Sequence, residues 1–143
     1  MTEKSRKPHF QVAAGLVWKE GKVLISKRKM SAHLGGLWEF PGGKQEQGES
    51  LEECLERELE EELGLKTKAN SPLLRVHHEY ESKRITLHVF SCLLLSGEAR
   101  AMEGQEIRWV DPADLTEFAF PPPDLKVIEF LNRGTGSSGR VQR

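Results

Sequence analysis

Residues 43–65 read GKQEQGESLEECLERELEEELGL, a stretch that predicts a helix with both of its ends inside it. Ser50, followed three residues later by Glu53, is a capping-box pattern that marks a helix N-terminus. Gly64 provides the stop, because glycine readily takes the left-handed conformation that ends many helices. Apolar residues recur between them at helical spacing, at Leu51, Cys54, Leu55, Leu59 and Leu63. We therefore expect an amphipathic helix that begins after Ser50 and packs this stripe on the core.

The remaining surface of this helix is unusually acidic. Nine residues of the stretch are glutamate, and Glu58, Glu61 and Glu62 stand at i, i+3 and i+4, which places them on one face. Like charges at these spacings destabilise an isolated helix by roughly 0.2–0.5 kcal/mol per pair. Hard divalent cations favour clustered carboxylate oxygens. The pattern therefore marks a candidate metal-binding face, with an ordinary solvated surface as the alternative for a glutamate-rich helix.

The spacing of the whole stretch matches a family motif. Gly43 is followed after five residues by Glu49, and after seven more by RELEEELGL at residues 57–65. This resembles the Nudix box, G-x5-E-x7-R-E-U-x-E-E-x-G-U with U apolar, and every defined position is filled. The similarity to MutT-type members extends over roughly residues 11–131 and includes the segments 27–28, 38–43, 85–87, 103–105 and 120–122.

The resemblance implies a fold and a reaction. The expected fold class is α/β, a Nudix α/β/α sandwich with a central mixed sheet. The expected reaction is hydrolysis of a nucleoside diphosphate linked to a further group. In MutT-type members that group is phosphate, so a nucleoside triphosphate gives a monophosphate and pyrophosphate. The expected cofactor is Mg²⁺, with Mn²⁺ as a substitute, because such ions neutralise phosphates and acidify bound water.

The resemblance also implies roles for individual residues. The expected metal ligands are Gly43, Glu58, Glu61, Glu62 and Glu103, and the expected catalytic residues are Glu61, Glu62, Arg57 and Glu103. Gly43 would act through its backbone carbonyl, since the absent side chain allows a close approach. Arg57 can orient a neighbouring carboxylate through a bidentate ion pair. Glu49 is expected to support the loop and helix geometry rather than to bind metal.

The expected substrate-binding residues are Arg28, Phe40, Lys44 and Asp124. Arg28 resembles a phosphate-contacting arginine, and Phe40 resembles a residue of the base pocket, with core packing as its equal alternative. Asp124 stands where MutT proteins carry an asparagine that reads oxidised guanine, and an ionised Asp can only accept hydrogen bonds. We expect it on a rigid loop at the pocket mouth. Lys83 replaces a substrate-loop arginine and is given no role.

Outside the box, hydrophobic alternation and turn residues predict strands at 10–18, 22–27, 37–40, 73–80, 85–95 and 106–110. Pro41-Gly42-Gly43 should end the third of these strands. A short helix is expected at 127–132, after the proline run 121–123. The domain organisation is expected to be a flexible N-terminus at 1–8, a Nudix domain at 9–133 and a disordered C-terminal tail at 134–143.

Composition narrows the class of protein. The chain has 143 residues, enough for one domain with its own core. With 21 basic and 22 acidic residues the net charge is −1, so no extended nucleic-acid binding is expected. No apolar run approaches the ~18 residues of a membrane span, and MTEKSRKPHF lacks a signal-peptide core. We expect Cys54 and Cys92 to be reduced core thiols, and the protein to be cytoplasmic, with no membrane partner, and a monomer or homodimer.

The functional hypothesis is MutT-like clean-up of oxidised or surplus nucleotides, of the 8-oxo-dGTP or CTP and modified-pyrimidine type. One alternative is removal of pyrophosphate from the 5′ end of triphosphorylated RNA, which needs few phosphate contacts. Another is a nucleotide-sensing Nudix module without hydrolytic activity. Such modules are expected to lose glutamates of the box, whereas this chain retains all of them.

Overall fold

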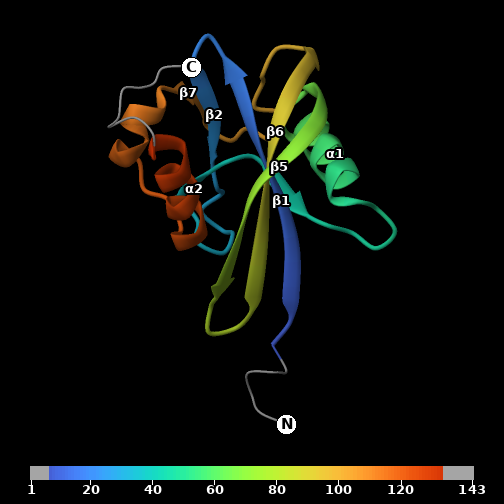
Figure 1. Cartoon of the computed structure of the whole chain (residues 1–143), viewed down its shortest axis with the longest axis vertical. Helices are drawn as coiled ribbons and strands as arrows, with labels where there is room; N and C mark the ends of the chain where they lie inside the picture. The colour runs from blue at the N-terminus through green and yellow to red at the C-terminus, as the bar shows by residue number, and fades with distance from the viewer. Residues whose placement is uncertain (1–6, 134–143) are drawn as a thin grey trace.

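The computed structural model describes residues 7–133 as one sheet with a helical layer on each face (Figure 1). The strands are β1 (His9–Lys19), β2 (Lys22–Lys27), β3 (Trp38–Glu39), β4 (Gly42–Lys44), β5 (Lys66–Glu79), β6 (Arg84–Ser96) and β7 (Ile107–Val110). The helices are α1 (Leu51–Leu63), α2 (Pro122–Asn132) and the 3₁₀ helix η2 (Pro112–Glu117). The predicted α/β/α sandwich is confirmed.

The sheet is mixed, and β1 lies at its centre. β1 runs parallel to β6, whereas β2 and β4 pair with it in the antiparallel sense. β5 forms an antiparallel hairpin with β6, and β3 and β7 both pair with β2. The lower halves of β1, β5 and β6 extend well beyond α1 (Figure 1). The parallel β1–β6 pairing makes the sheet mixed, as predicted.

Two hydrophobic cores lie on opposite faces of the sheet because side chains alternate along β1. Ala13 and Val17 face the apolar stripe of α1, whereas Ala14 and Leu16 face the layer of α2 and η2. The stripe of α1 is buried as predicted, at Cys54, Leu55, Leu59 and Leu63. Truncating one of these leucines to alanine typically costs about 2–5 kcal/mol. Packing therefore fixes the rotation of α1 and hence the direction of its glutamates.

The ends of α1 follow the sequence prediction. Ser50 Oγ accepts a hydrogen bond from Glu53 N at 3.0 Å, and Glu53 Oε1 accepts one from Ser50 N at 2.9 Å. Gly64 ends the helix in the left-handed conformation, with φ of 69°. Capping is local, since it depends only on residues within one turn, and this is why the sequence predicts it correctly.

The proline-glycine segment before the helix ends a strand as predicted, since β3 stops at Glu39, but it also contains the start of a strand that was not predicted. β4 begins at Gly42 and pairs with β1 opposite Ala14. A side chain at Gly42 would collide with the Ala13 carbonyl. Glycine thus allows a close approach of two backbones here, in addition to marking a turn.

Two further boundaries differ for identifiable reasons. α2 begins at Pro122 rather than at 127, since the first helical turn tolerates prolines that lack the N–H. β5 begins at Lys66 rather than at 73 and passes Pro72 through shifts of register. Pro72 has no backbone N–H to donate. Because β5 is an edge strand, this absence interrupts no pairing on its outer side. The helix η2 was not predicted.

The first described residues are held to the β5–β6 hairpin. Lys7 Nζ donates to Glu79 Oε2 and to Tyr80 O, each at 2.9 Å, and Arg84 N donates to Pro8 O at 2.9 Å. The expected flexible segment 1–8 lies outside the described residues up to residue 6, and the expected tail 134–143 lies outside them entirely. None of the helices between residues 7 and 133 has the length and apolarity to span a membrane.

Candidate active site

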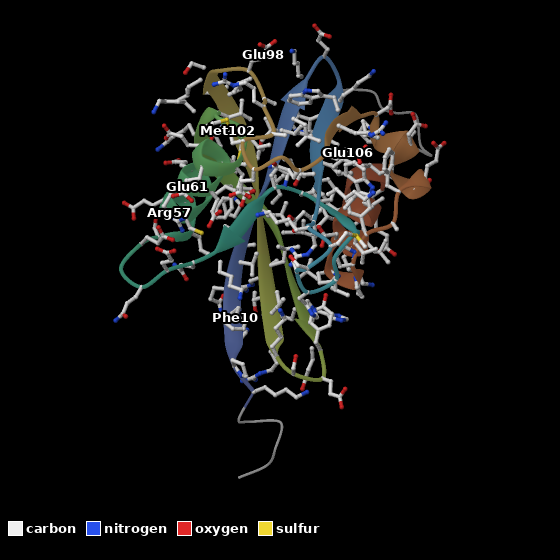
Figure 2. The ribbon with its side chains drawn as sticks, turned by 180° about the vertical axis from the view of Figure 1, so that it is seen from behind. Phe10, Arg57, Glu61, Glu98, Met102 and Glu106 are labelled. Carbon is white, nitrogen blue, oxygen red and sulfur yellow. The ribbon has the colours of Figure 1, made fainter. Side chains whose placement is uncertain are left out.

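Arg57 is the centre of an ion-pair network on α1. Its guanidinium donates two hydrogen bonds to the Glu49 carboxylate, from Nε at 3.1 Å and from Nη2 at 2.8 Å. Its Nη1 lies 3.1 Å from Glu58 Oε2 and 3.4 Å from Glu61 Oε1. Figure 2 shows Arg57 and Glu61 together on α1. The planar fork of arginine suits this bidentate contact, so Arg57 fixes the carboxylates on either side of it.

Glu49 is held as a carboxylate by this contact. The hydrogen bonds from Arg57, and then the one from the Glu46 backbone N–H, lower the pKa of Glu49 to about 2. The same ion pair raises the pKa of Arg57. Glu49 thereby ties the loop before the helix to the middle of α1, across eight residues of sequence. This contact supports the loop geometry expected for Glu49.

Glu58 and Glu62 form a second, more enclosed pair of carboxyl groups. They stand one turn apart on α1, on the same face of the helix. Burial raises the pKa of Glu62 to about 9, and Glu58, Glu39 and Glu103 add to the rise. Four acidic groups from three segments of the chain thus repel one another around one point. A bound cation would relieve this repulsion and favour the ionised form.

The backbone at Gly43 fits beside this pair. A side chain at Gly43 would collide with the carboxyl group of Glu58, so only glycine leaves that group its place. The buried Cys54 thiol donates to the carbonyls of Gly43 and Lys44, at 3.5 and 3.3 Å. Within residues 7–133, no three His, Cys, Asp or Glu side chains form a ready-made metal site. The donor set nevertheless suits a hard divalent ion, since it consists of carboxylates and a carbonyl.

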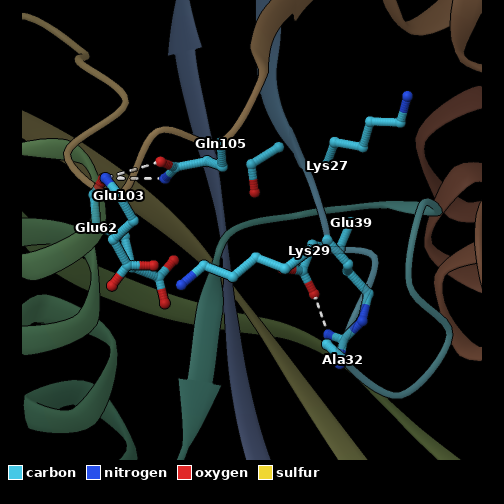
Figure 3. Close-up of a pocket in the computed structure, with 9 residues that line it drawn as sticks. Lys27, Lys29, Ala32, Glu39, Glu62, Glu103 and Gln105 are labelled. Atoms are coloured by element: carbon cyan, nitrogen blue, oxygen red, sulfur yellow. Dashed lines mark hydrogen bonds and ion pairs between the residues drawn. The ribbon is translucent and has the colours of Figure 1, made fainter.

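Glu61 lies apart from this point. Its side chain is exposed and contacts Arg57, whereas Glu62 and Glu103 line a pocket of about 200 Å³. Figure 3 shows the carboxylates of Glu62 and Glu103 close together in this pocket. Gln105 positions Glu103 beside Glu62, because its side-chain amide donates to Glu62 O and accepts from Glu103 N, each at 3.0 Å. Helix α1 and the loop before β7 therefore meet at the pocket.

Arg28 and Glu39 form the opposite side of the same pocket. Arg28 Nη1 donates to Glu39 Oε1 at 2.6 Å, and Arg28 Nε donates to His33 O at 2.7 Å. Burial raises the pKa of Glu39, which Arg28 opposes and Glu58 reinforces. Glu39 thus holds Arg28 on the wall of the pocket opposite Glu62 and Glu103. The sequence analysis gave Glu39 no role.

A group of cations continues from Arg28 along the α2 side of the sheet. Lys44 Nζ lies 4.2 Å from the centre of the Phe10 ring, and Lys83 lies over the same ring at 5.9 Å. Burial lowers the pKa of Lys83, and the charges of Lys44 and Arg28 lower it further. The structure therefore brings Lys83 next to the two cations expected to bind substrate. Phe10 gave no signal in the sequence that could have placed it there.

Asp124 lies deeper than expected. It is in the first turn of α2, only 8% exposed, rather than on a loop at the pocket mouth. The backbone N–H of Phe40 donates to its Oδ2 at 3.4 Å, while the buried Phe40 ring stacks on Phe120 in the core. Burial raises the pKa of Asp124 to about 7, and Glu39 adds to the rise. The ionised form expected from the sequence only accepts hydrogen bonds, whereas the protonated form, favoured below about pH 7, can also donate one.

The family model of the NUDIX domain matches residues 13–130. The chain belongs to the Nudix family. It is 35% identical over 125 residues to the 8-oxo-dGTP diphosphatase of Escherichia coli K12, covering 87% of this chain and 97% of that protein. It is 32% identical over 120 residues to the CTP pyrophosphohydrolase of the same strain, covering 84% and 89%. A crystal structure of the MutT protein from Methanosarcina mazei Go1 superposes with a TM-score of 0.81, at 26% identity, covering 91% and 97%.

This Nudix chain is a hydrolase of the MutT type. Nudix hydrolases generally use a divalent metal ion. The complete Nudix box accounts for the ion pair between Arg57 and Glu49 and for the position of Gly43 against Glu58. Tyr80 is a neighbour of Asp124 that the sequence analysis missed. Burial raises the pKa of Tyr80, and the charge of Asp124 raises it further.

Proposed function

We propose that this protein hydrolyses ribo- or deoxynucleoside triphosphates to monophosphates and pyrophosphate with Mg²⁺, and that Mn²⁺ can substitute. The observation that carries the proposal is the position of an acidic cluster, with Glu58, Glu62 and Glu103, directly opposite a cationic wall. A triphosphate needs both features, since metal ions bind its oxygens on one side and side-chain cations on the other.

The proposed metal-binding residues are the Gly43 carbonyl, Glu58, Glu62 and Glu103, with Glu61 as a further carboxylate. Bound Mg²⁺ would supply positive charge to the phosphates and lower the pKa of a water molecule. Arg57 positions Glu58 through the 3.1 Å contact described above. Glu61, Glu62 and Glu103 are proposed as the groups that accept a proton from the attacking water: Glu62 and Glu103 line the pocket, and Glu61 is the exposed carboxylate beside Arg57 on the same helix.

Arg28 and Lys44 are proposed to bind the phosphates, and Lys83 adds charge beside them. Asp124 is proposed to read the base, with Phe40 beside it as a further substrate-binding residue. A carboxyl group with a pKa of about 7 both accepts and, when protonated, donates hydrogen bonds. This property supports substrates of both kinds named for the relatives, 8-oxo-dGTP and CTP. The proposed role is the removal of oxidised or surplus nucleotides.

We further propose that the protein acts on free nucleotides in the cytoplasm, as a monomer or homodimer. Cys54 and Cys92 are both free and buried, which suits a reducing compartment. The nearly balanced charge argues against an extended nucleic-acid surface.

The test is pyrophosphate release from a panel of nucleoside triphosphates, including 8-oxo-dGTP and CTP, with a 5′-triphosphorylated RNA beside them. Turnover should require Mg²⁺ or Mn²⁺ and stop in excess chelator. Glu62→Gln should lower kcat by at least about 100-fold, as expected for loss of a metal-site charge. The matched control is Glu60→Gln, on the exposed side of the same helix, where the Glu60 carboxylate pairs with Lys66. Turnover that persists in chelator, or that only RNA supports, would contradict the proposal.

A further inference from the structure

Three consecutive cations at the end of β2 and directly after it line the pocket across from the acidic cluster. They are Lys27, Arg28 and Lys29, and the opposite wall carries Glu62 and Glu103. Arg28 was expected to bind substrate, whereas its two neighbours were given no role in the sequence analysis. The three differ in how they are already engaged, and this difference assigns a function to one of them.

Lys27 and Arg28 are held by carboxylates. Lys27 Nζ lies 3.9 Å from Glu106 Oε1 and also faces the ring of Trp38 at 5.8 Å. Arg28 is bound to Glu39 at 2.6 Å. Lys29 forms no ion pair with a carboxylate of residues 7–133, and it is exposed. Its side chain extends across the pocket toward the carboxylates of Glu62 and Glu103 (Figure 3). Lys29 is therefore the cation of this wall with an unengaged charge.

The backbone at Lys29 is fixed although its side chain is free. Its carbonyl accepts a hydrogen bond from Ala32 N at 3.0 Å, and Gly36 N closes the loop onto the carbonyl of Arg28 at 3.0 Å. Gly36 has a φ of 83°, a conformation that glycine adopts without strain. A flexible side chain on a fixed backbone suits a ligand whose charged groups move during the reaction.

We propose that Lys29 binds the terminal phosphates of the nucleoside triphosphate, the two that leave as pyrophosphate. The inference rests on the proposed function. Metal ions on Glu62 and Glu103 would cover one side of these phosphates, and the Lys29 ammonium would cover the side that faces β2. Lys29 makes the site selective for a triphosphate chain over a monophosphate, because it contacts the part of the substrate that a monophosphate lacks.

The test compares Lys29→Gln, which removes the charge at similar length, with Lys29→Arg, which keeps a cation. Lys22→Gln is the control, since Lys22 is exposed at the far end of β2. The readouts are the binding of pyrophosphate in the presence of Mg²⁺ by calorimetry, the KM for the triphosphate, and inhibition by the nucleoside monophosphate. One charge-assisted hydrogen bond corresponds to about a tenfold change in affinity.

We expect Lys29→Gln to weaken pyrophosphate binding and to raise KM, each about tenfold, with monophosphate inhibition unchanged. Lys29→Arg should bind pyrophosphate much as the wild type does. Unchanged pyrophosphate binding in Lys29→Gln would overturn the inference, as would an equal loss for pyrophosphate and monophosphate. If the wild type hydrolyses no triphosphate, the proposed function fails first and the inference with it. If the wild type is active and Lys29→Gln matches it, the inference fails alone.

Discussion

Replacing Asp124 by Asn should stabilise the protein by an amount that grows with pH. Asp124 is buried in the first turn of α2, where Phe40 N–H is its backbone partner and Glu39 repels its charge. Asn has the same shape and retains an oxygen that can accept from Phe40. It removes the ionisation and adds an amide donor that does not titrate, so the pH dependence of the difference between the two proteins isolates the cost of burying this charge.

The magnitude follows from the pKa. Burial raises the pKa of Asp124 from an ordinary 3.8 to about 7. Each pKa unit corresponds to about 1.36 kcal/mol, so ionising this group costs about 4 kcal/mol more in the folded protein than in the unfolded chain. Because the folded pKa is the higher one, the wild type is most stable below pH 3.8 and loses this stability as pH rises to about 7. Above that pH the difference from Asn should be constant.

The assay is urea unfolding of both proteins between about pH 4.5 and about pH 8.5, with the free energy of unfolding taken at each pH. Asp114→Asn is the matched control, since it removes a carboxylate that is exposed in η2 and that folding does not bury. An Asp124→Asn difference that stays within about 0.5 kcal/mol over this range would refute the reasoning, because Asp124 would then ionise as freely as in the unfolded chain.

Three further predictions concern activity. Asp124→Asn should shift kcat/KM toward 8-oxo-dGTP and away from CTP by about 1–3 kcal/mol at pH above 7, because Asn adds a donor. The shift should shrink at lower pH, where the wild-type carboxyl also donates. A base preference that does not change with pH would contradict this. Glu103→Gln should lower kcat at saturating substrate more than it changes KM; a loss in KM alone would make Glu103 a binding residue only. Arg57→Lys should raise the Mg²⁺ concentration needed for half-maximal rate, since lysine cannot donate two parallel hydrogen bonds to Glu49. An unchanged Mg²⁺ titration would show that the Arg57 guanidinium does not position the acidic cluster.

Local order in the chain was sufficient to predict α1 and the identity of the box. The cap at Ser50, the stop at Gly64 and the buried stripe depend on residues within a few positions of one another, and the structure confirms all three. The contact of Arg57 with its neighbour Glu58 is likewise set by one stretch of helix. Because these interactions join residues that are close together in the sequence, the spacing alone determines them.

The tertiary structure decided which distant groups meet and how deeply they are buried. Phe40 and Asp124 are 84 residues apart, and the burial that raises the pKa of Asp124 arises only when the first turn of α2 packs against Phe40. Likewise, the extra strand β4 depends on how closely Gly42 approaches β1. Whether Lys29 is engaged depends on which carboxylates other loops bring near it. Charge, exposure and proximity are properties of the packed chain, since desolvation and repulsion act through space and not along the sequence.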